Sequence, residues 1–357
     1  MNDNNRIRLE LSSICQLKCP VCLTALGITS KLVDTPYVSF TKFKNLIDTS
    51  PQIKYIETSH QGEIFLNPDL LKIIHYSYEQ GITLTADSGV NLNTASKDVL
   101  QALVKYKFRS LFVSIDGATQ EIYSKYRVGG NISQVFENLN MINYYKKKYQ
   151  SRFPLLIWQF IEFDHNKHER IDAMNAARKF KMGFIRKVAC SDEDIQENVN
   201  NILYRLALKK YNKEALDIIE NYPVPIKLKK QIQKHICAHL WYGPQIRSNG
   251  QVVGCCRNLN FGDYGNAFDS GIAECIYGEK MQYARRMIMG KNKERKDIPC
   301  YKCPNYIRMK YFNNWITPTY ISMRKLLLFL KNDYLFQQKL VSFFHEKLFY
   351  KPNANAI

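Results

Sequence analysis

The chain has 357 residues, 45% of them hydrophobic, which suits one large globular domain with a smaller one and excludes a disordered or fibrous protein. Its N-terminus is polar and its longest apolar run covers only residues 326–330, so we expect neither a secretory signal peptide nor a membrane-spanning helix. The net charge of +19 is typical of a protein with an anionic partner or of a lysine-rich genome; without a nucleic-acid-binding motif we expect no nucleic-acid partner.

The first 190 residues alternate strand-like and helix-like segments. Strands are predicted over residues 7–11, 53–58, 82–86, 110–115, 155–163 and 184–188, and helices over 41–47, 67–80, 94–106, 131–149 and 167–181. Ser39, Asn67 and Asn131 are the predicted N-caps. Six β/α units imply an α/β fold with a parallel sheet and helices outside it, and chemistry at the carboxyl ends of the strands.

Three of the ten cysteines, Cys15, Cys19 and Cys22, follow the first predicted strand with the spacing C-x3-C-x2-C. Without an expected export signal, cysteines favour metal ligation in a reducing cytosol over disulfides, so we expect a cytoplasmic protein. Thiolates are the preferred ligands of iron–sulfur clusters, and a [4Fe-4S] cluster takes four, so three would leave one iron open. The alternatives are a zinc site, which usually combines two C-x2-C pairs, or three unrelated buried cysteines.

This cysteine spacing after a first strand resembles the signature of the radical S-adenosylmethionine (SAM) superfamily. The resemblance implies a partial (β/α)6 TIM-like barrel, a [4Fe-4S] cluster on Cys15, Cys19 and Cys22, and SAM bound to the open iron. It also implies reductive cleavage of SAM to a 5′-deoxyadenosyl radical that abstracts a substrate hydrogen. Val21 departs from the family, where an aromatic residue is common; we expect this to weaken a packing contact near the adenine and to leave ligation unchanged.

Gly62 and Glu63 follow the second predicted strand. They resemble the family's Gly-Gly-Glu-Pro motif, with Gln61 and Ile64 in place of its outer residues. The resemblance implies that the backbone of this segment and the Glu63 side chain meet the ammonium group of SAM.

Ser114 and Asp116 end the fourth predicted strand, and Arg127 follows within SIDGATQEIYSKYRVGG, a segment similar to relatives that carry an additional C-terminal cluster. The resemblance implies that Ser114 and Asp116 reach the SAM ribose hydroxyls and that Arg127 reaches the methionine carboxylate. The alternatives are a turn residue for Asp116 and a surface ion pair for Arg127. Gln159, a polar residue between aromatic neighbours on the fifth strand, is expected to point into the barrel.

A second group of four cysteines has the spacing C-x17-C-x44-C-x2-C: Cys237, Cys255, Cys300 and Cys303. Between them, Asn249-Gly250 predicts a hairpin turn. The pattern resembles the SPASM/twitch extension of radical SAM enzymes, and it implies one auxiliary [4Fe-4S] cluster fully ligated by protein. A structural zinc ribbon is the alternative, because four thiolates also suit zinc.

Three further cysteines are the thiols available as hydrogen donors to a substrate: Cys190, Cys256 and Cys275. Cys256 has three interpretations: a ligand in place of Cys255, a thiol facing the substrate, or a small buried side chain. We name Cys256 and Cys275 as the candidate catalytic thiols.

We predict four parts: a radical SAM core over residues 1–190, a helical connection over 191–236, an auxiliary-cluster domain over 237–306 and a basic amphipathic helical tail over 307–357. Apolar residues of the tail recur at helical spacing: Leu327, Leu330, Tyr334, Val341, Phe344 and Leu348. Such a helix packs either on protein or on a membrane interface, and we expect the former.

The barrel begins by residue 7, so we expect no fused leader-peptide-binding domain. This favours a small or carbohydrate-like substrate that is oxidised or epimerised at a hydroxylated carbon, with a low-potential donor such as flavodoxin or ferredoxin. The alternatives are a peptide-modifying maturase that uses a separate recognition partner, and a non-catalytic iron–sulfur scaffold.

Overall fold

The structure is a computed structural model that describes residues 5–20, 22–188, 232–258 and 262–332. The chain forms two compact units, Met1–Trp315 and Ile316–Ile357. In the second unit the described part is a single helix, α15 (Pro318–Asn332), which carries Leu327 and Leu330. Four apolar residues of the predicted tail lie outside the described residues: Tyr334, Val341, Phe344 and Leu348. Val21 and most of the predicted connection over 191–236 lie outside them as well.

A seven-stranded sheet forms the centre of the first unit, with the order β6-β5-β4-β3-β2-β1-β7. Every pairing in it is parallel. The sheet is open, because β6 and β7 lie at opposite edges. Its strands are β1 (Arg6–Leu9), β2 (Tyr55–Glu57), β3 (Thr83–Val90), β4 (Ser110–Ser114), β5 (Leu155–Glu162), β6 (Gly183–Val188) and β7 (Gln245–Ile246).

The six predicted strands are confirmed, and so is the α/β class with a parallel sheet. Apolar alternation in β1 sends Ile7 and Leu9 into the core, where both are fully buried, and leaves Arg8 on the other face. The seventh strand was not predicted, because two residues carry no periodic signal.

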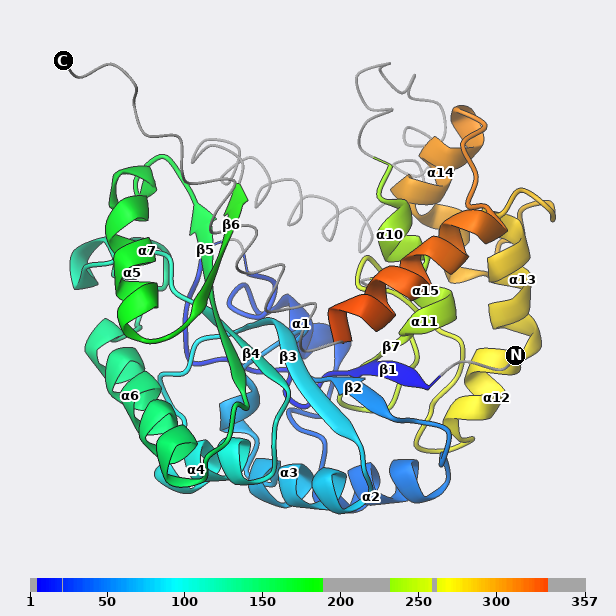
Figure 1. Cartoon of the computed structure of the whole chain (residues 1–357). Coiled ribbons are helices and arrows are strands. Elements are labelled where there is room, and N and C mark those ends of the chain that lie inside the picture. Colours follow the sequence, from blue (N-terminus) through cyan, green and yellow to red (C-terminus); the bar gives the residue numbers. More distant parts are fainter. Residues whose placement is uncertain (1–4, 21, 189–231, 259–261, 333–357) are drawn as a thin grey trace. The chain divides into compact units, whose positions relative to one another are not determined.

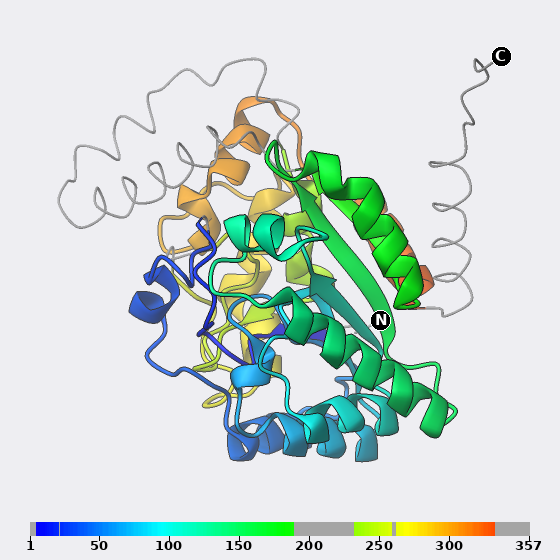
Figure 2. The ribbon, with the colours of Figure 1, turned by 90° about the vertical axis from the view of Figure 1, so that its left-hand side faces the viewer.

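Helices cover the outer face of the curved sheet, as Figure 1 shows for α2, α3, α4 and α6. Figures 1 and 2 both place α7 against β5 and β6, with which it is in contact. The helices of this half are α1 (Ile28–Leu32), α2 (Phe40–Asp48), α3 (Leu70–Glu79), α4 (Lys97–Lys105), α5 (Gln120–Tyr126), α6 (Ile132–Lys148) and α7 (Arg170–Lys179), with 3-10 turns η1 (Ile64–Leu66) and η2 (Lys167–Glu169).

Two of the three predicted caps are confirmed. Ser39 accepts a hydrogen bond from Lys42 N, and Asn131 accepts one from Gln134 N. The cap at Asn67 was wrong, because α3 begins three residues later. Asn67 Nδ2 instead donates to the carbonyl oxygens of Leu11 (2.8 Å) and Val38 (3.0 Å), which ties α3 to the segment after β1.

The C-terminal part of the first unit returns to the β1 edge. Arg247 N donates to Gln251 O across the Asn249-Gly250 turn, and Ile246 pairs antiparallel with Val252, so the predicted hairpin forms. The remaining elements are α10 (Lys234–Cys237), α11 (His239–Tyr242), α12 (Ile272–Tyr277), α13 (Glu279–Ile288), η4 (Pro299–Lys302) and α14 (Pro304–Tyr311). Among the described residues, no helix is long and apolar enough to cross a membrane.

Candidate functional site

The cysteine loop after β1 gathers Cys15, Cys19 and Cys22 around a small buried group. Leu17, Cys19, Tyr126 and Phe163 form that group, and Cys15 and Cys22 pack against it. The loop is held in place by Lys18 N, which donates to Val128 O at 2.9 Å. The three cysteines therefore lie around one buried group in the loop that follows β1.

Burial sets the chemistry of these thiols. It raises the pKa of Cys15 to about 12, and the neighbouring Glu63, Cys19 and Cys22 add to the rise. It also raises the pKa of Cys19, against the lowering effect of Arg127. Such thiols stay protonated unless a cation takes the place of the proton, so this donor set fits a positively charged metal group.

Arg127 lies beside the cysteine loop rather than on the surface. Its Nε donates to Asp116 Oδ2 at 2.6 Å, and its Nη1 lies 3.8 Å from Cys19 Sγ. Asp116, which is fully buried, also accepts from Ile161 N at 2.6 Å. Burial raises the pKa of Asp116 and Arg127 opposes that rise. A buried pair of this kind orients its guanidinium firmly toward Cys19.

The backbone around position 62 leaves room for glycine and for no side chain. Its φ is 65°, and a Cβ there would lie 2.5 Å from Ser12 O and 2.8 Å from Ile14 O. The close approach lets Glu63 N donate to Ile14 O at 2.7 Å, one residue before Cys15. The segment after β2 thus lies directly against the cysteine loop.

The Glu63 carboxylate is buried under this loop. Its Oε2 accepts from Asn91 N at 2.6 Å and its Oε1 from Phe65 N at 3.2 Å. Burial raises the pKa of Glu63 to about 7, although these backbone N–H groups oppose the rise. Both oxygens are therefore engaged within the chain.

Ser114 and Gln159 meet on the inner face of β4 and β5. Gln159 Nε2 donates to Ser114 Oγ at 3.1 Å, and both side chains are buried. Gly89 on β3 faces them, since a Cβ there would lie 2.5 Å from Ser114 Oγ. The expectation that Gln159 points inward agrees with this placement.

The second cysteine group lines one cavity of about 370 Å³ that opens to solvent. Its thiols belong to Cys237, Cys255, Cys300 and Cys303. Burial raises the pKa of all four thiols. Asn305 Nδ2 donates to Cys237 Sγ at 2.8 Å, and the hydroxyl of Tyr264 lies 3.4 Å from Cys300 Sγ. Across the part of the chain that the structure describes, no three His, Cys, Asp or Glu side chains form a site for a single metal ion.

The remaining candidate thiols lie in different places. Cys256 lines a second cavity, which Cys255 also reaches, whereas Cys275 lines neither cavity. Cys275 is buried on α12, with its Sγ 3.7 Å from Ser270 Oγ. Cys190 lies outside the described residues.

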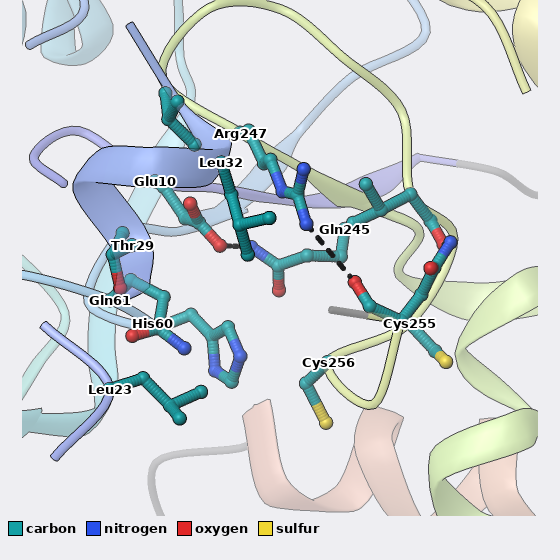
Figure 3. Close-up of a pocket in the computed structure, with 13 residues that line it drawn as sticks. Glu10, Leu23, Thr29, Leu32, His60, Gln61, Gln245, Arg247, Cys255 and Cys256 are labelled. Carbon is teal, nitrogen blue, oxygen red and sulfur yellow. Dashed lines mark hydrogen bonds between the residues drawn. The ribbon is translucent and has the colours of Figure 1, made fainter. Parts of the chain in front are cut away.

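The second cavity opens to solvent between β1, the segment after β2 and β7. Figure 3 shows Glu10, His60, Gln245 and Cys256 around the same space. Sequence reasoning missed the first three. The rule that chemistry follows the strand ends could have found Glu10 and His60, but Gln245 carries no sequence signal.

The carboxyl and imidazole groups of this cavity are strongly perturbed. Burial raises the pKa of Glu10 to about 8, with Arg247 and Arg8 opposing. Burial and the adjacent Arg8 cation lower the pKa of His60 to about 3, so the imidazole is neutral at physiological pH. Perturbed pairs in a cleft are typical of functional sites.

No protein-family model matches the sequence, and a search of curated proteins found no match. Among solved structures, SuiB of Streptococcus suis bound to S-adenosylmethionine is similar at a TM-score of 0.57 and 13% identity, over 85% of this chain and 72% of SuiB. SuiB bound to precursor peptide SuiA has a TM-score of 0.57 and 12% identity, over 86% of this chain and 71% of SuiB. BtrN in complex with AdoMet and 2-DOIA has a lower TM-score of 0.45 and 15% identity, over 84% of this chain and 92% of BtrN. At these identities the SuiB match establishes a shared fold.

Substituting Gly62 by Ala should lower the free energy of unfolding by at least about 3 kcal/mol, because the new Cβ meets two carbonyl oxygens as well as a positive φ. Gly81→Ala is the matched control: its φ is 66°, nothing lies within 4 Å of its Cβ, and it should cost about 1 kcal/mol. Urea unfolding measures both. Equal losses would contradict the assigned close contact.

Glu10→Gln should change the pH dependence of stability. The folded pKa of about 8 exceeds the usual 4.5, so the wild type loses stability as pH rises from about 4.5 to about 8. Glutamine removes this loss, and relative to wild type the variant should gain about 3–5 kcal/mol between pH 5 and pH 8.5. Urea unfolding at both pH values tests this, with the exposed Glu121→Gln as control. A difference that stays constant with pH would refute it.

Proposed function

We propose that this chain is a radical SAM enzyme that oxidises or epimerises a hydroxylated carbon of a small, carbohydrate-like substrate. The observation that carries the proposal is the convergence of Cys15, Cys19 and Cys22 on one buried group at the carboxyl end of the sheet, with Arg127 directed at Cys19. The spacing of these cysteines and the fold shared with SuiB support it.

Under this proposal Cys15, Cys19 and Cys22 hold a [4Fe-4S] cluster whose fourth iron binds SAM. When bound, the cluster supplies the electron that cleaves SAM to methionine and a 5′-deoxyadenosyl radical. The raised thiol pKa values fit this role, because thiols that resist losing a proton to water can still give it up to iron. The Arg127 guanidinium, whose Nη1 lies 3.8 Å from Cys19 Sγ, would balance part of the thiolate charge and bind the methionine carboxylate of SAM.

The other predicted SAM contacts remain part of the proposal: Glu63 and the backbone near Gly62 would meet the SAM ammonium, and Ser114 and Asp116 its ribose hydroxyls. Gly62 allows the segment after β2 to pack directly against the cysteine loop. Glu63 holds Asn91 N, and Asn91 Nδ2 lies 3.6 Å from Cys15 Sγ. Ser114 and Gln159 offer a polar patch on the inner face of the sheet, suited to the hydroxyls of a ribose. Asp116 supports Arg127, and its second oxygen is engaged by Ile161 N.

The cavity lined by Cys237, Cys255, Cys300 and Cys303 would hold a second [4Fe-4S] cluster of the SPASM/twitch type. Its four thiols would ligate every iron, so this group would serve electron transfer rather than SAM binding. An electron acceptor here would make the reaction an oxidation. Hydrogen return from a thiol would make it an epimerisation, and Cys256, which lines the second cavity, suits that role better than Cys275.

A peptide-modifying enzyme is the second candidate, because the similar SuiB has been solved with precursor peptide SuiA bound. SAM cleavage that depends on an added peptide and not on a sugar would favour it. The buried carboxyl of Glu10 and the polar lining of the second cavity favour the small hydroxylated substrate.

Iron and sulfide per chain after anaerobic reconstitution test the two-cluster proposal. We expect about eight irons in the wild type and about four in the Cys15/Cys19/Cys22→Ala variant, which should also lose dithionite-driven formation of 5′-deoxyadenosine. About four irons falling to none would mean that the second cysteine group holds no cluster. Full loading without any SAM cleavage in the wild type would favour the scaffold alternative.

Single variants distinguish the two adjacent cysteines. Cys255 lines both cavities and Cys256 only the second, so Cys255→Ala should lower the iron content from about eight to about four, whereas Cys256→Ala should leave it near eight. Cys275→Ala serves as the control for a buried thiol that lines neither cavity. The reverse pattern would assign the ligand to Cys256.

A further inference from the structure

The second cavity contains a polar pair that the proposed chemistry does not use. Gln245 and His60 both line it. Gln245 Oε1 has no hydrogen-bond partner among the described residues, and the His60 ring is bonded at Nδ1 to Arg8 Nη2. Gln245 is only 1% exposed, and its Oε1 has no partner. A buried acceptor left unpaired costs about 1–3 kcal/mol, so such an atom points to a ligand that satisfies it.

The amide orientation of Gln245 is set by its neighbour. Its Nε2 donates to Glu10 Oε1 at 3.0 Å, so the oxygen must face the other way. Figure 3 shows this oxygen directed toward the space that His60 and Cys256 also border. Gln245 therefore presents an acceptor to the cavity.

The tautomer of His60 is set by Arg8. Arg8 Nη2 lies 3.2 Å from His60 Nδ1, and a guanidinium only donates, so Nδ1 accepts and the proton of the neutral ring lies on Nε2. Arg8 is in turn held by Ser88 Oγ at 2.9 Å and by the Glu57 carboxylate at 3.5 Å. His60 therefore presents an N–H donor to the cavity that already contains the Gln245 acceptor.

We propose that this cavity binds a hydroxyl group of a small cyclic polyol, which accepts from His60 Nε2–H and donates to Gln245 Oε1. A hydroxyl is the common group that can do both at one atom. The site deepens the proposed function, on which its role in catalysis rests, because it holds the hydroxylated carbon in the cavity that Cys256 borders.

Anionic ligands fit this cavity poorly. Of the guanidinium groups beside it, Arg8 bonds His60, Ser88 and Glu57 through Nη2, and Arg247 donates to Gln251 Oε1 at 2.7 Å and to Asn258 O at 3.3 Å. Glu10 adds a carboxyl whose pKa burial raises to about 8, so it offers a phosphate or carboxylate no opposite charge. The lining therefore selects a neutral or amino-substituted polyol.

Saturation-transfer NMR on the reconstituted full chain with SAM tests the site. The probes are myo-inositol, D-glucose and D-glucosamine, with Kd obtained by titration. We expect at least one probe to bind, and His60→Phe and Gln245→Leu each to raise its Kd about tenfold through loss of one hydrogen bond to a buried partner. His60→Gln keeps a donor at similar reach and should stay within about threefold of wild type.

His75→Phe and Gln101→Leu repeat the same chemical changes outside the cavity and should leave Kd unchanged, while circular dichroism and iron content check that each variant folds. The proposal is overturned if no probe binds, or if neither His60→Phe nor Gln245→Leu weakens binding. The readout is separate from SAM cleavage: polyol binding without cleavage would sink the proposed function alone, and cleavage without polyol binding would sink this site alone.

Discussion

The site depends on one constraint, the parallel pairing of β1 to β5. Parallel register brings the carboxyl ends of strands that are far apart in sequence to one edge of the sheet. The contacts made there are specific: Glu63 with Asn91 N, Gly62 with Ser12 O, and Asp116 with Ile161 N. Each joins the end of one strand to a neighbouring one, so the cysteine loop is shaped by residues up to 150 positions away along the chain.

Burial explains why the polar groups of this edge are arranged in pairs. A buried charge without a partner costs several kcal/mol, and Arg127 with Asp116 and Arg8 with Glu57 both avoid that cost. The same pairs also fix the orientation of the side chains beside them. Arg127 is turned toward Cys19, and Arg8 decides which nitrogen of His60 carries the proton. Asp116 thus positions Arg127, and Arg8 positions His60.

The seventh strand, β7, connects the part of the chain that carries the second cysteine group to the sheet that carries the first. β7 pairs with β1, and residues 245–315 belong to the same compact unit as the cysteine loop. Glu10 at the end of β1 and Gln245 on β7 then meet in a hydrogen bond of 3.0 Å. The cavity beside Cys256 exists because of this pairing, and it lies between the two parts of the chain that carry the cysteine groups.

The sequence by itself determined the α/β class, the six strands and the two cysteine groups, because periodicity, caps and motif spacing are local and each survives in a short window. The resemblance to radical SAM enzymes also pointed to Gly62, Glu63, Asp116 and Arg127. Only the tertiary structure decided that Arg127 pairs with Asp116, that β7 joins β1, and that Cys255 lines both cavities whereas Cys256 lines one. The cavity of Glu10, His60 and Gln245 belongs to this second class, since its residues come from three strands or strand ends and have no shared spacing in the chain.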